Sequence, residues 1–326
     1  MSKVANKHAG KRSNIQEKGE KEVFKKYVPG WSFTDLDIQS NFILLMVFRL
    51  LCALLRSHNS VHPDEFWQVT QVAYNWVYGG VNLPWEFKSQ YRLRNVLYPA
   101  YIAAPMYFVK LLGLDSPTVV YYLPYMAQLL LAILNDHFIW KVGKKTVGVD
   151  GTRIGVLLIV MNHFQIEYIT RCFGNSLEQI LSVIAFYYYL KQKDRFTMDT
   201  VILTATITVA FIGRNTSIVG WIPLLAIKVL REGSLPPFLL SALTVAIPCM
   251  AFMVYVDTLY YDSDDWTVTS VNFLKVNILE GLSKFFGEDP WYMYVIGHAF
   301  GLFTVVYPFL LYAITVGHAD ISWSKN

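Results

Sequence analysis

The chain has 326 residues, of which 54% are hydrophobic, 16% aromatic and 16% charged. With a mean hydropathy of +0.34 it is too apolar for an ordinary soluble domain, and this composition is typical of a bilayer protein. Much of the net charge of +4 lies in the first thirty residues. A basic segment before a hydrophobic span favours a cytosolic tail near anionic lipid over a nucleic-acid-binding arm. We therefore expect no nucleic-acid partner.

Two domains follow from this composition: a basic cytosolic tail, residues 1–36, and a single transmembrane module, residues 37–326. The first apolar run begins near Asn41, so we expect an uncleaved anchor and no cleavable signal peptide. The cysteines lack the spacing of a zinc site or a disulfide framework and are interpreted as packing residues. They are Cys52, Cys172 and Cys249.

Apolar stretches that approach or reach the ~20 residues needed to cross a bilayer recur along the chain. They predict an all-α polytopic membrane protein with about eight crossings. No internal repeat is visible. The stretches lie near 40–57, 96–113, 118–140, 152–170, 174–191, 199–213, 217–230, 236–256 and 293–316.

Lysine and arginine in the connections predict the orientation, because basic loops stay in the cytosol. A cytosolic N-terminus then places the connections 58–95, 171–174, 214–216 and 257–292 in the lumen. The scheme requires that 96–113 and 118–140 make one net crossing, so we expect 96–113 to be re-entrant or to lie on the lumenal surface. The basic residues are Lys141, Lys144, Lys145, Arg153, Lys191, Lys193, Arg195, Lys228 and Arg231.

The first predicted lumenal loop begins with a helix rich in chemically useful residues. Pro63 suits the first helical position, acids suit the first turn, and Gly79 and Gly80 end the apolar periodicity. Asp64 and Glu65 are open to two interpretations: acids that stabilise a helix start, or a catalytic pair. Adjacent helical residues point about 100° apart, so only one of them faces a given reacting atom.

A carboxylate at the bilayer surface is what a transferase needs to deprotonate a sugar hydroxyl beside a lipid-linked donor. His62, Trp67 and Gln68 would surround it. Farther along, Arg92 and Arg94 are suited to a phosphate, or alternatively form a basic rim anchored by interfacial aromatics.

Polar residues also mark the other predicted lumenal turns. Ionisable groups at membrane depth are candidates for function, although Arg171 near a helix end is equally compatible with snorkelling to water. The 257–273 segment combines acids, hydroxyls and aromatics and would cover a sugar or a glycolipid. The candidate residues of these turns are Arg171, Asn175, Glu178, Asp257, Tyr260 and Trp266.

Four ordered blocks resemble the mannosyltransferases of glycosyltransferase family 22, and within it the branch that acts on the glycosylphosphatidylinositol (GPI) precursor. The resemblance implies a C-type glycosyltransferase fold, a lumenal active site in the endoplasmic reticulum membrane, and no metal or other cofactor. The blocks are His62 to Gln68, Arg94 to Pro99, Arg171 to Glu178, and Asp257 to Tyr261 followed by Trp266 to Leu274.

The same resemblance implies the substrates and the bond that is formed. The donor would be dolichyl phosphate mannose and the acceptor a GPI-anchor glycolipid, which receives its third mannose through an α-1,2 bond with inversion. Asp64 would be the base, and Glu65 its substitute or an orienting partner. Arg94 and Arg171 are the phosphate candidates, and protein partners are not implied.

The chain departs from the family in two places. Members usually continue with further membrane segments, and Asn215 stands where proline is expected. Because of these departures, one alternative is that the chain is an inactive short form that acts as an interaction partner. Another dolichyl-phosphate-mannose-dependent enzyme of N-glycan assembly and a membrane transporter are further alternatives; a transporter would favour charges near the midplane and an internal repeat.

Overall fold

The computed structural model describes residues 38–56, 62–160, 162–193, 195–303 and seven positions between 307 and 315. The predicted tail, 1–36, and residues 317–326 lie outside these ranges. The chain forms two compact units, Met1–Val47 and Phe48–Asn326, and the second carries every contact discussed below. Within the described ranges all regular structure is helical, which confirms the predicted all-α class.

The helices begin and end close to the predicted apolar stretches. The stretch 152–170 is divided between two helices, and 236–256 is one continuous rod with a π-helical turn at Ala242–Ala246. The major helices are α2 (Ile38–Arg56), α5 (Leu97–Leu111), α6 (Pro117–Thr146), α7 (Gly148–Val160), α8 (His163–Glu167), α9 (Gly174–Lys191), α10 (Met198–Gly213), α11 (Ile218–Glu232), α12 (Leu235–Ser241) and α13 (Ile247–Tyr260).

Shorter helices form the connections and the region after α13. After α13, the helical segment that begins at Thr269 ends before Gly281, whose φ is +69°. These elements are α3 (Pro63–Glu65), η2 (Phe66–Thr70), α4 (Gln71–Tyr78), η3 (Trp85–Phe87), η4 (Asn215–Ser217), α14 (Thr269–Leu274), η6 (Lys275–Leu279), η7 (Leu282–Phe286), α15 (Trp291–Met293), η8 (Tyr294–His298) and α16 (Ala299–Phe303).

Two helical segments are long and apolar enough to cross a membrane, Pro117–Thr146 and Leu235–Tyr260, judged on the described residues. Ile43–Leu55 and Met198–Gly213 are shorter apolar helices. The eight crossings and the C-type fold stay predictions.

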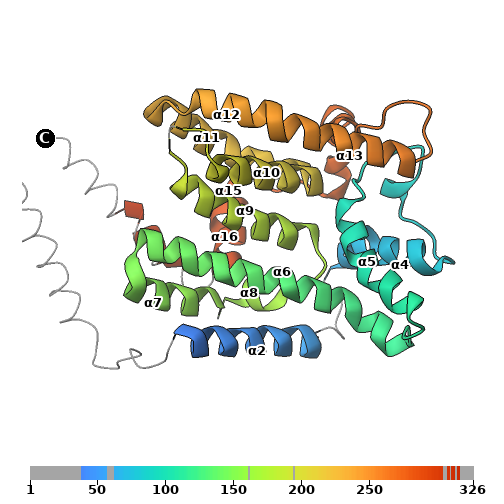
Figure 1. Ribbon diagram of the computed structural model, residues 1–326, viewed down its shortest axis with the longest axis horizontal. Coiled ribbons are helices and arrows are strands. Elements are labelled where there is room, and N and C mark those ends of the chain that lie inside the picture. The colour runs from blue at the N-terminus through green and yellow to red at the C-terminus, as the bar shows by residue number, and fades with distance from the viewer. Residues whose placement is uncertain are drawn as a thin grey trace, which may run out of the picture. The chain divides into compact units, whose positions relative to one another are not determined.

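The long helices pack side by side in the order α12–α13, α10, α9, α6 and α7 (Figure 1). Apolar side chains fill the space between them. Ala185 of α9 packs with Leu203 and Ile207 of α10 and with Trp221 of α11. On the other face of α9, Ile180 belongs to a cluster with residues of α6. Helix α9 therefore lies at the centre of this bundle.

Helix α5 packs along the beginning of α6. The Tyr98 hydroxyl donates to Gln128 Oε1 at 2.7 Å, and the Tyr101 hydroxyl donates to the carbonyl of Ala127 at 2.8 Å. Both acceptors lie in the first half of the 30-residue α6, whose length is about 45 Å at 1.5 Å per residue. Helix α5 therefore runs beside the first half of α6, and the single net crossing of the two stays a prediction.

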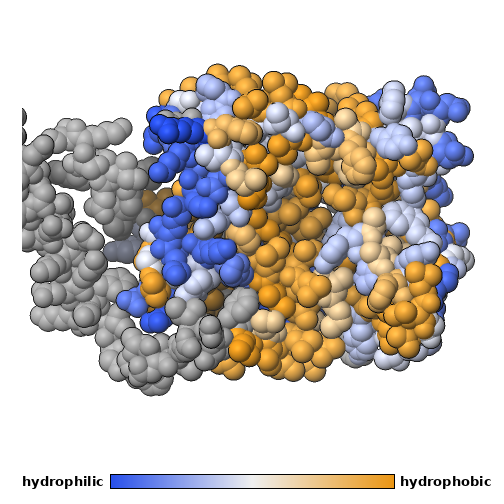
Figure 2. All heavy atoms as spheres, in the orientation of Figure 1, coloured by the Kyte–Doolittle hydropathy of each residue, from blue (hydrophilic) through white to orange (hydrophobic). Residues whose placement is uncertain are grey.

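A band of hydrophobic residues covers the middle of the Phe48–Asn326 unit, and hydrophilic residues gather at its two ends (Figure 2). One end carries the basic ends of α6, α9 and α11, with Lys145, Lys191 and Arg231. The turns that the sequence placed in the lumen meet at the opposite end, which we call the acidic-loop end. Its described residues are 62–95, 171–174, 214–216 and 257–292. The structure thus confirms that these turns share one end, while the side of the membrane stays a prediction.

A buried ion pair connects α2 to α6 inside the apolar band. Arg49 donates from Nε to Asp136 Oδ2 at 2.7 Å and from Nη2 to Oδ1 at 3.0 Å. Its Nη1 donates to the carbonyl of Gln165 at 2.7 Å. Since Arg49 and Asp136 are 0% and 2% exposed, each charge depends on the other for its solvation.

Candidate active site

The first loop helix begins at Pro63, as predicted, and its cap positions the two acids. His62 adopts an extended backbone conformation, and its Nδ1 accepts a hydrogen bond from the Asp64 N–H at 3.3 Å. A π-helical turn, η2, follows at once and continues into α4, which ends at Gly79 with φ of +73°. Such turns are often found at functional sites in helices.

Glu65 points into the protein and forms a buried cluster with two residues of the α8 region. Its Oε2 lies 2.9 Å from Arg171 Nη1, and Arg171 Nη2 lies 3.2 Å from Glu167 Oε1. The three side chains are 2%, 3% and 7% exposed. Burial raises the pKa of Glu65, an effect that the neighbouring guanidinium partly offsets. This cluster attaches the first loop helix to the turn before α9.

The placement of the cluster bears on two predicted roles. Arg171, a candidate phosphate contact, already holds two carboxylates and is enclosed. Glu65, the substitute base, has one oxygen on Arg171, and within the described part of the chain its buried Oε1 has no hydrogen-bond partner. Both residues are placed to orient the neighbouring Asp64.

Asp64 points the other way and is the more accessible acid of the pair. Its side chain is 40% exposed, and Oδ2 lies 3.7 Å from His62 Nδ1. The His62 ring in turn lies 5.3 Å from the ring of Phe173, at the turn before α9. Asp64 thus stands at the surface of the acidic-loop end with an imidazole beside it.

Arg214, at the C-terminal end of α10, is a site residue that sequence reasoning missed. Its Nε lies 3.0 Å from Glu178 Oε2 and 3.0 Å from the Thr216 hydroxyl. Burial lowers the pKa of Arg214; Glu178 and Asp64 raise it, and Arg94 lowers it again. The charges of Asp64 and Arg94 therefore both act on Arg214. An arginine directly after an apolar helix was the signal that could have found it.

Arg94 is the second cation of this group. Its Nε and Nη2 donate to Glu86 Oε1 at 3.1 and 2.9 Å, and its guanidinium lies 5.8 Å from the centre of the Phe273 ring. The Tyr261 hydroxyl donates to the Arg94 carbonyl at 2.7 Å. Contacts from the two long loops, 58–95 and 257–292, therefore hold Arg94 in place.

Asp257, predicted to bind substrate, joins the two long loops. It is 2% exposed and accepts hydrogen bonds from Asn95 Nδ2 at 2.8 Å, the Val96 N–H at 3.3 Å and the Thr269 hydroxyl at 3.1 Å. The Ser270 hydroxyl reaches Asn215 at 3.0 Å and so ties the same region to the turn after α10. Asp257 is placed to position its neighbours.

The remaining predicted residues lie around this group. Arg92 donates to the Ser89 carbonyl and the Ser263 hydroxyl, and its backbone adopts a φ of +49°. Tyr260 packs against Trp76 with ring centres 5.1 Å apart. Trp67 and Trp266 are 48% and 72% exposed, Asn175 is exposed and Gln68 is half-buried.

The arrangement combines a carboxylate, an imidazole and two guanidinium groups at one end of an apolar bundle. Both contacts of Arg214 use Nε, so among the described residues its Nη nitrogens stay available to a further acceptor. Arginine matches phosphate oxygens in geometry and charge, and a carboxylate can accept a proton from a hydroxyl. These groups together can bind an anion and accept a proton from a hydroxyl.

Comparison with known proteins identifies the family of the chain. The model of the Alg9-like mannosyltransferase family matches residues 40–324, so the chain belongs to that family and the predicted resemblance is confirmed. It is 30% identical over 80% of its length to the GPI alpha-1,2-mannosyltransferase 3 of Bos taurus, of which it covers 47%. It is 31% identical over 85% of its length to the GPI mannosyltransferase 3 of Trypanosoma brucei brucei (strain 927/4 GUTat10.1), of which it covers 56%.

The human GPI alpha-1,2-mannosyltransferase 3 is 29% identical over 79% of the chain, which covers 46% of that protein. The chain thus spans about half the length of the curated relatives it matches. No solved structure matches it.

Proposed function

We propose that the chain is a lumenal mannosyltransferase of the endoplasmic reticulum membrane. It transfers mannose from dolichyl phosphate mannose to a GPI precursor and adds the third mannose by an α-1,2 bond with inversion. The single observation that carries this proposal is that the partly exposed Asp64 lies at the same end of the apolar bundle as Arg94 and Arg214. The names of the relatives support the choice of sugar and acceptor.

The reaction is a single displacement in this proposal. The acceptor hydroxyl oxygen forms a bond to C1 of mannose while the bond from C1 to the phosphate oxygen breaks. Asp64 takes the hydroxyl proton, and the electron pair of the broken bond leaves with dolichyl phosphate. Arg94 and Arg214 stabilise the negative charge that develops on the phosphate. His62 holds the first turn that presents Asp64.

Expression in cells that lack GPI mannosyltransferase 3 tests the activity. The chain should return GPI-anchored proteins to the cell surface, and Asp64→Asn, made at equal protein level, should abolish this rescue because an amide cannot take the proton. Asp265→Asn is the matched control, since Asp265 is an exposed acid of a loop at the same end. Full rescue by Asp64→Asn would refute the role of this residue, and lack of rescue by the unchanged chain would refute the function.

A second experiment tests the location of the site. Single cysteines at Lys88 and Lys193, both exposed and at opposite ends of the bundle, should be labelled by an impermeant reagent from the lumen and the cytosol respectively. Cytosolic labelling at residue 88 would rule out a lumenal active site.

A further inference from the structure

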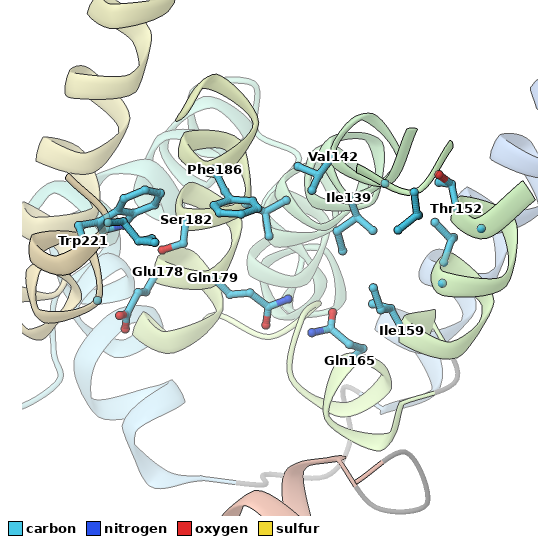
Figure 3. A pocket seen from close by; sticks show the side chains of 18 of the residues that line it. Ile139, Val142, Thr152, Ile159, Gln165, Glu178, Gln179, Ser182, Phe186 and Trp221 are labelled. Carbon is cyan, nitrogen blue, oxygen red and sulfur yellow. The ribbon is translucent and has the colours of Figure 1, made fainter. Parts of the chain in front are cut away.

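A groove of about 700 Å³ runs between α6, α7, α9 and α11. This volume lies within the usual range of small-molecule sites. Figure 3 shows Ile139 and Val142 on one wall, Phe186 beside them, and Ile159 and Thr152 from α7 across the space. The groove extends along α9 from Glu178 to Phe186, eight residues or about 12 Å.

The two ends of the groove differ in chemistry. Toward Val142 and Thr152, at the basic end of the bundle, its walls are mostly apolar. At the other end the side chains of Gln165 and Gln179 point toward one another from α8 and α9 (Figure 3). Glu178 lies at the same end. A molecule that fits both ends has a long apolar part and a polar head.

Two buried polar atoms at the polar end lack partners within the described part of the chain. They are the Ser217 hydroxyl oxygen, on a residue that is 4% exposed, and Gln165 Oε1. Both residues line the groove. Buried polar groups are normally hydrogen-bonded, so these two atoms can each bond to a polar group of a ligand or to a water in the groove.

The polar end of the groove also adjoins the candidate active site. Glu178 lines the groove and lies 3.0 Å from Arg214, whose Nη nitrogens were noted above as available. Arg214 thus pairs with a residue at the polar end of an apolar groove, and a cation in this position is complementary to one anionic group on one hydrocarbon chain. The groove and Arg214 together match a lipid phosphate.

We propose that this groove holds the polyprenyl chain of the lipid phosphate donor, with its phosphate at Arg214. The identity of the occupant rests on the function proposed above, whereas the groove itself does not. In this proposal the polyprenyl chain of the donor extends from the acidic-loop end toward the basic end of the bundle. The sugar on the donor phosphate then lies on the Asp64 side of Arg214.

Two glycine positions allow a side chain to be added in the groove. A Cβ added at Gly155 or Gly220 meets no atom within 4 Å, and both residues line the groove. Gly301 of α16 is equally open and does not line it, so Gly301→Phe is the matched control. Arg214→Gln tests the phosphate contact separately.

Photolabelling of the full chain in lipid nanodiscs measures occupancy. The probe is a polyprenyl phosphate with a diazirine near the end of its chain, and peptides are mapped by mass spectrometry. We expect labels on α7 and α11, reduced about tenfold by Gly155→Phe and by Gly220→Phe and unchanged by Gly301→Phe, because a phenyl ring takes the space of the chain. Arg214→Gln should weaken labelling by the phosphate probe and leave labelling by the matching polyprenol unchanged.

Several results would overturn the proposal. These are labelling that neither phenylalanine variant reduces, labelling displaced by a diacyl phosphatidylinositol as strongly as by dolichyl phosphate, and labelling blocked by free inorganic phosphate alone. Labelling needs no transfer, so a chain that fails to rescue cells but is labelled as expected refutes the function and keeps the groove. Full rescue by a Gly155→Phe/Gly220→Phe double variant refutes the groove and keeps the function.

Discussion

Replacing Arg171 by methionine tests whether the buried cluster holds the first loop helix in place. The change keeps an unbranched apolar side chain but leaves Glu65 and Glu167, which are 2% and 7% exposed, without their shared cation. Each carboxyl group must then stay charged in a poorly solvated place or take up a proton.

The structure allows the cost to be worked out. Protonating one carboxyl group at pH 7, when its ordinary pKa is 4.5, costs about 3.4 kcal/mol at 1.36 kcal/mol per pH unit. Removing one partner of a buried pair typically costs about 3 to 5 kcal/mol, which agrees with at least one protonation. We therefore expect Arg171→Met to lower the free energy of unfolding by about 3 to 5 kcal/mol at pH 7.

The pH dependence has a definite sign. Since burial raises the pKa of Glu65 in the folded protein, its contribution to stability is complete below 4.5 and is lost as the pH rises through the folded value. Arg171→Met removes the guanidinium that lowers this pKa, so the folded value rises further. The loss of stability should therefore be larger at pH 7 than at pH 5, where protonation costs about 0.7 kcal/mol.

Denaturant titration in detergent micelles at the two pH values is the assay. Arg195→Met is the matched control, because it removes an exposed arginine from the opposite end of the bundle and should change stability little. A loss below about 1 kcal/mol at pH 7, or an equal loss at pH 5, would show that the cluster is not buried as described. Adding Glu65→Gln and Glu167→Gln to Arg171→Met should restore part of the loss.

Three further changes probe other contacts. Asp257→Ala should abolish rescue in the cell assay at unchanged protein level, because the two long loops lose their common acceptor; rescue at the normal level would refute this positioning role. Asp136→Asn should lower the free energy of unfolding by about 3 kcal/mol or more, since the buried Arg49 loses its counter-charge; a normal denaturation midpoint would contradict this. Gly143→Ala should destabilise by about 1 to 3 kcal/mol, because the added Cβ would stand 2.7 Å from Thr152; an unchanged midpoint would mean that α6 and α7 are farther apart.

The two changes that are read out as stability have controls in the chain. Gly155→Ala adds the same methyl group to α7 where it meets nothing within 4 Å, so it should not destabilise. Asp150→Asn removes an acid that is 79% exposed and should leave the denaturation midpoint unchanged.

The positions of helices were predictable because they depend on local sequence. Hydropathy over about 20 residues marks a span whatever its neighbours are, and Pro63 with two following acids marks a helix start through backbone geometry alone. The grouping of polar turns at one end followed from alternating the direction of successive spans. The position of residues 96–113 was not predictable from the sequence, because only the contacts of Tyr98 and Tyr101 fix how α5 lies along α6.

The roles of adjacent charged residues were not predictable in the same way. Sequence reasoning placed Asp64 and Glu65 on different helix faces, but which one is enclosed depends on Arg171, 106 residues away from Glu65. The Arg49–Asp136 pair likewise joins residues 87 positions apart. No local pattern identifies such partners.

The sequence by itself determined that this is an apolar helical protein with its polar turns at one end, because hydropathy, charge and helix caps act over a few residues. Only the tertiary structure decided that Asp64 is accessible, that Arg171 is occupied, and that Arg214 pairs with Glu178, which lines an apolar groove. The physical reason is that the solvation and partners of a charge depend on how distant helices are rotated against each other.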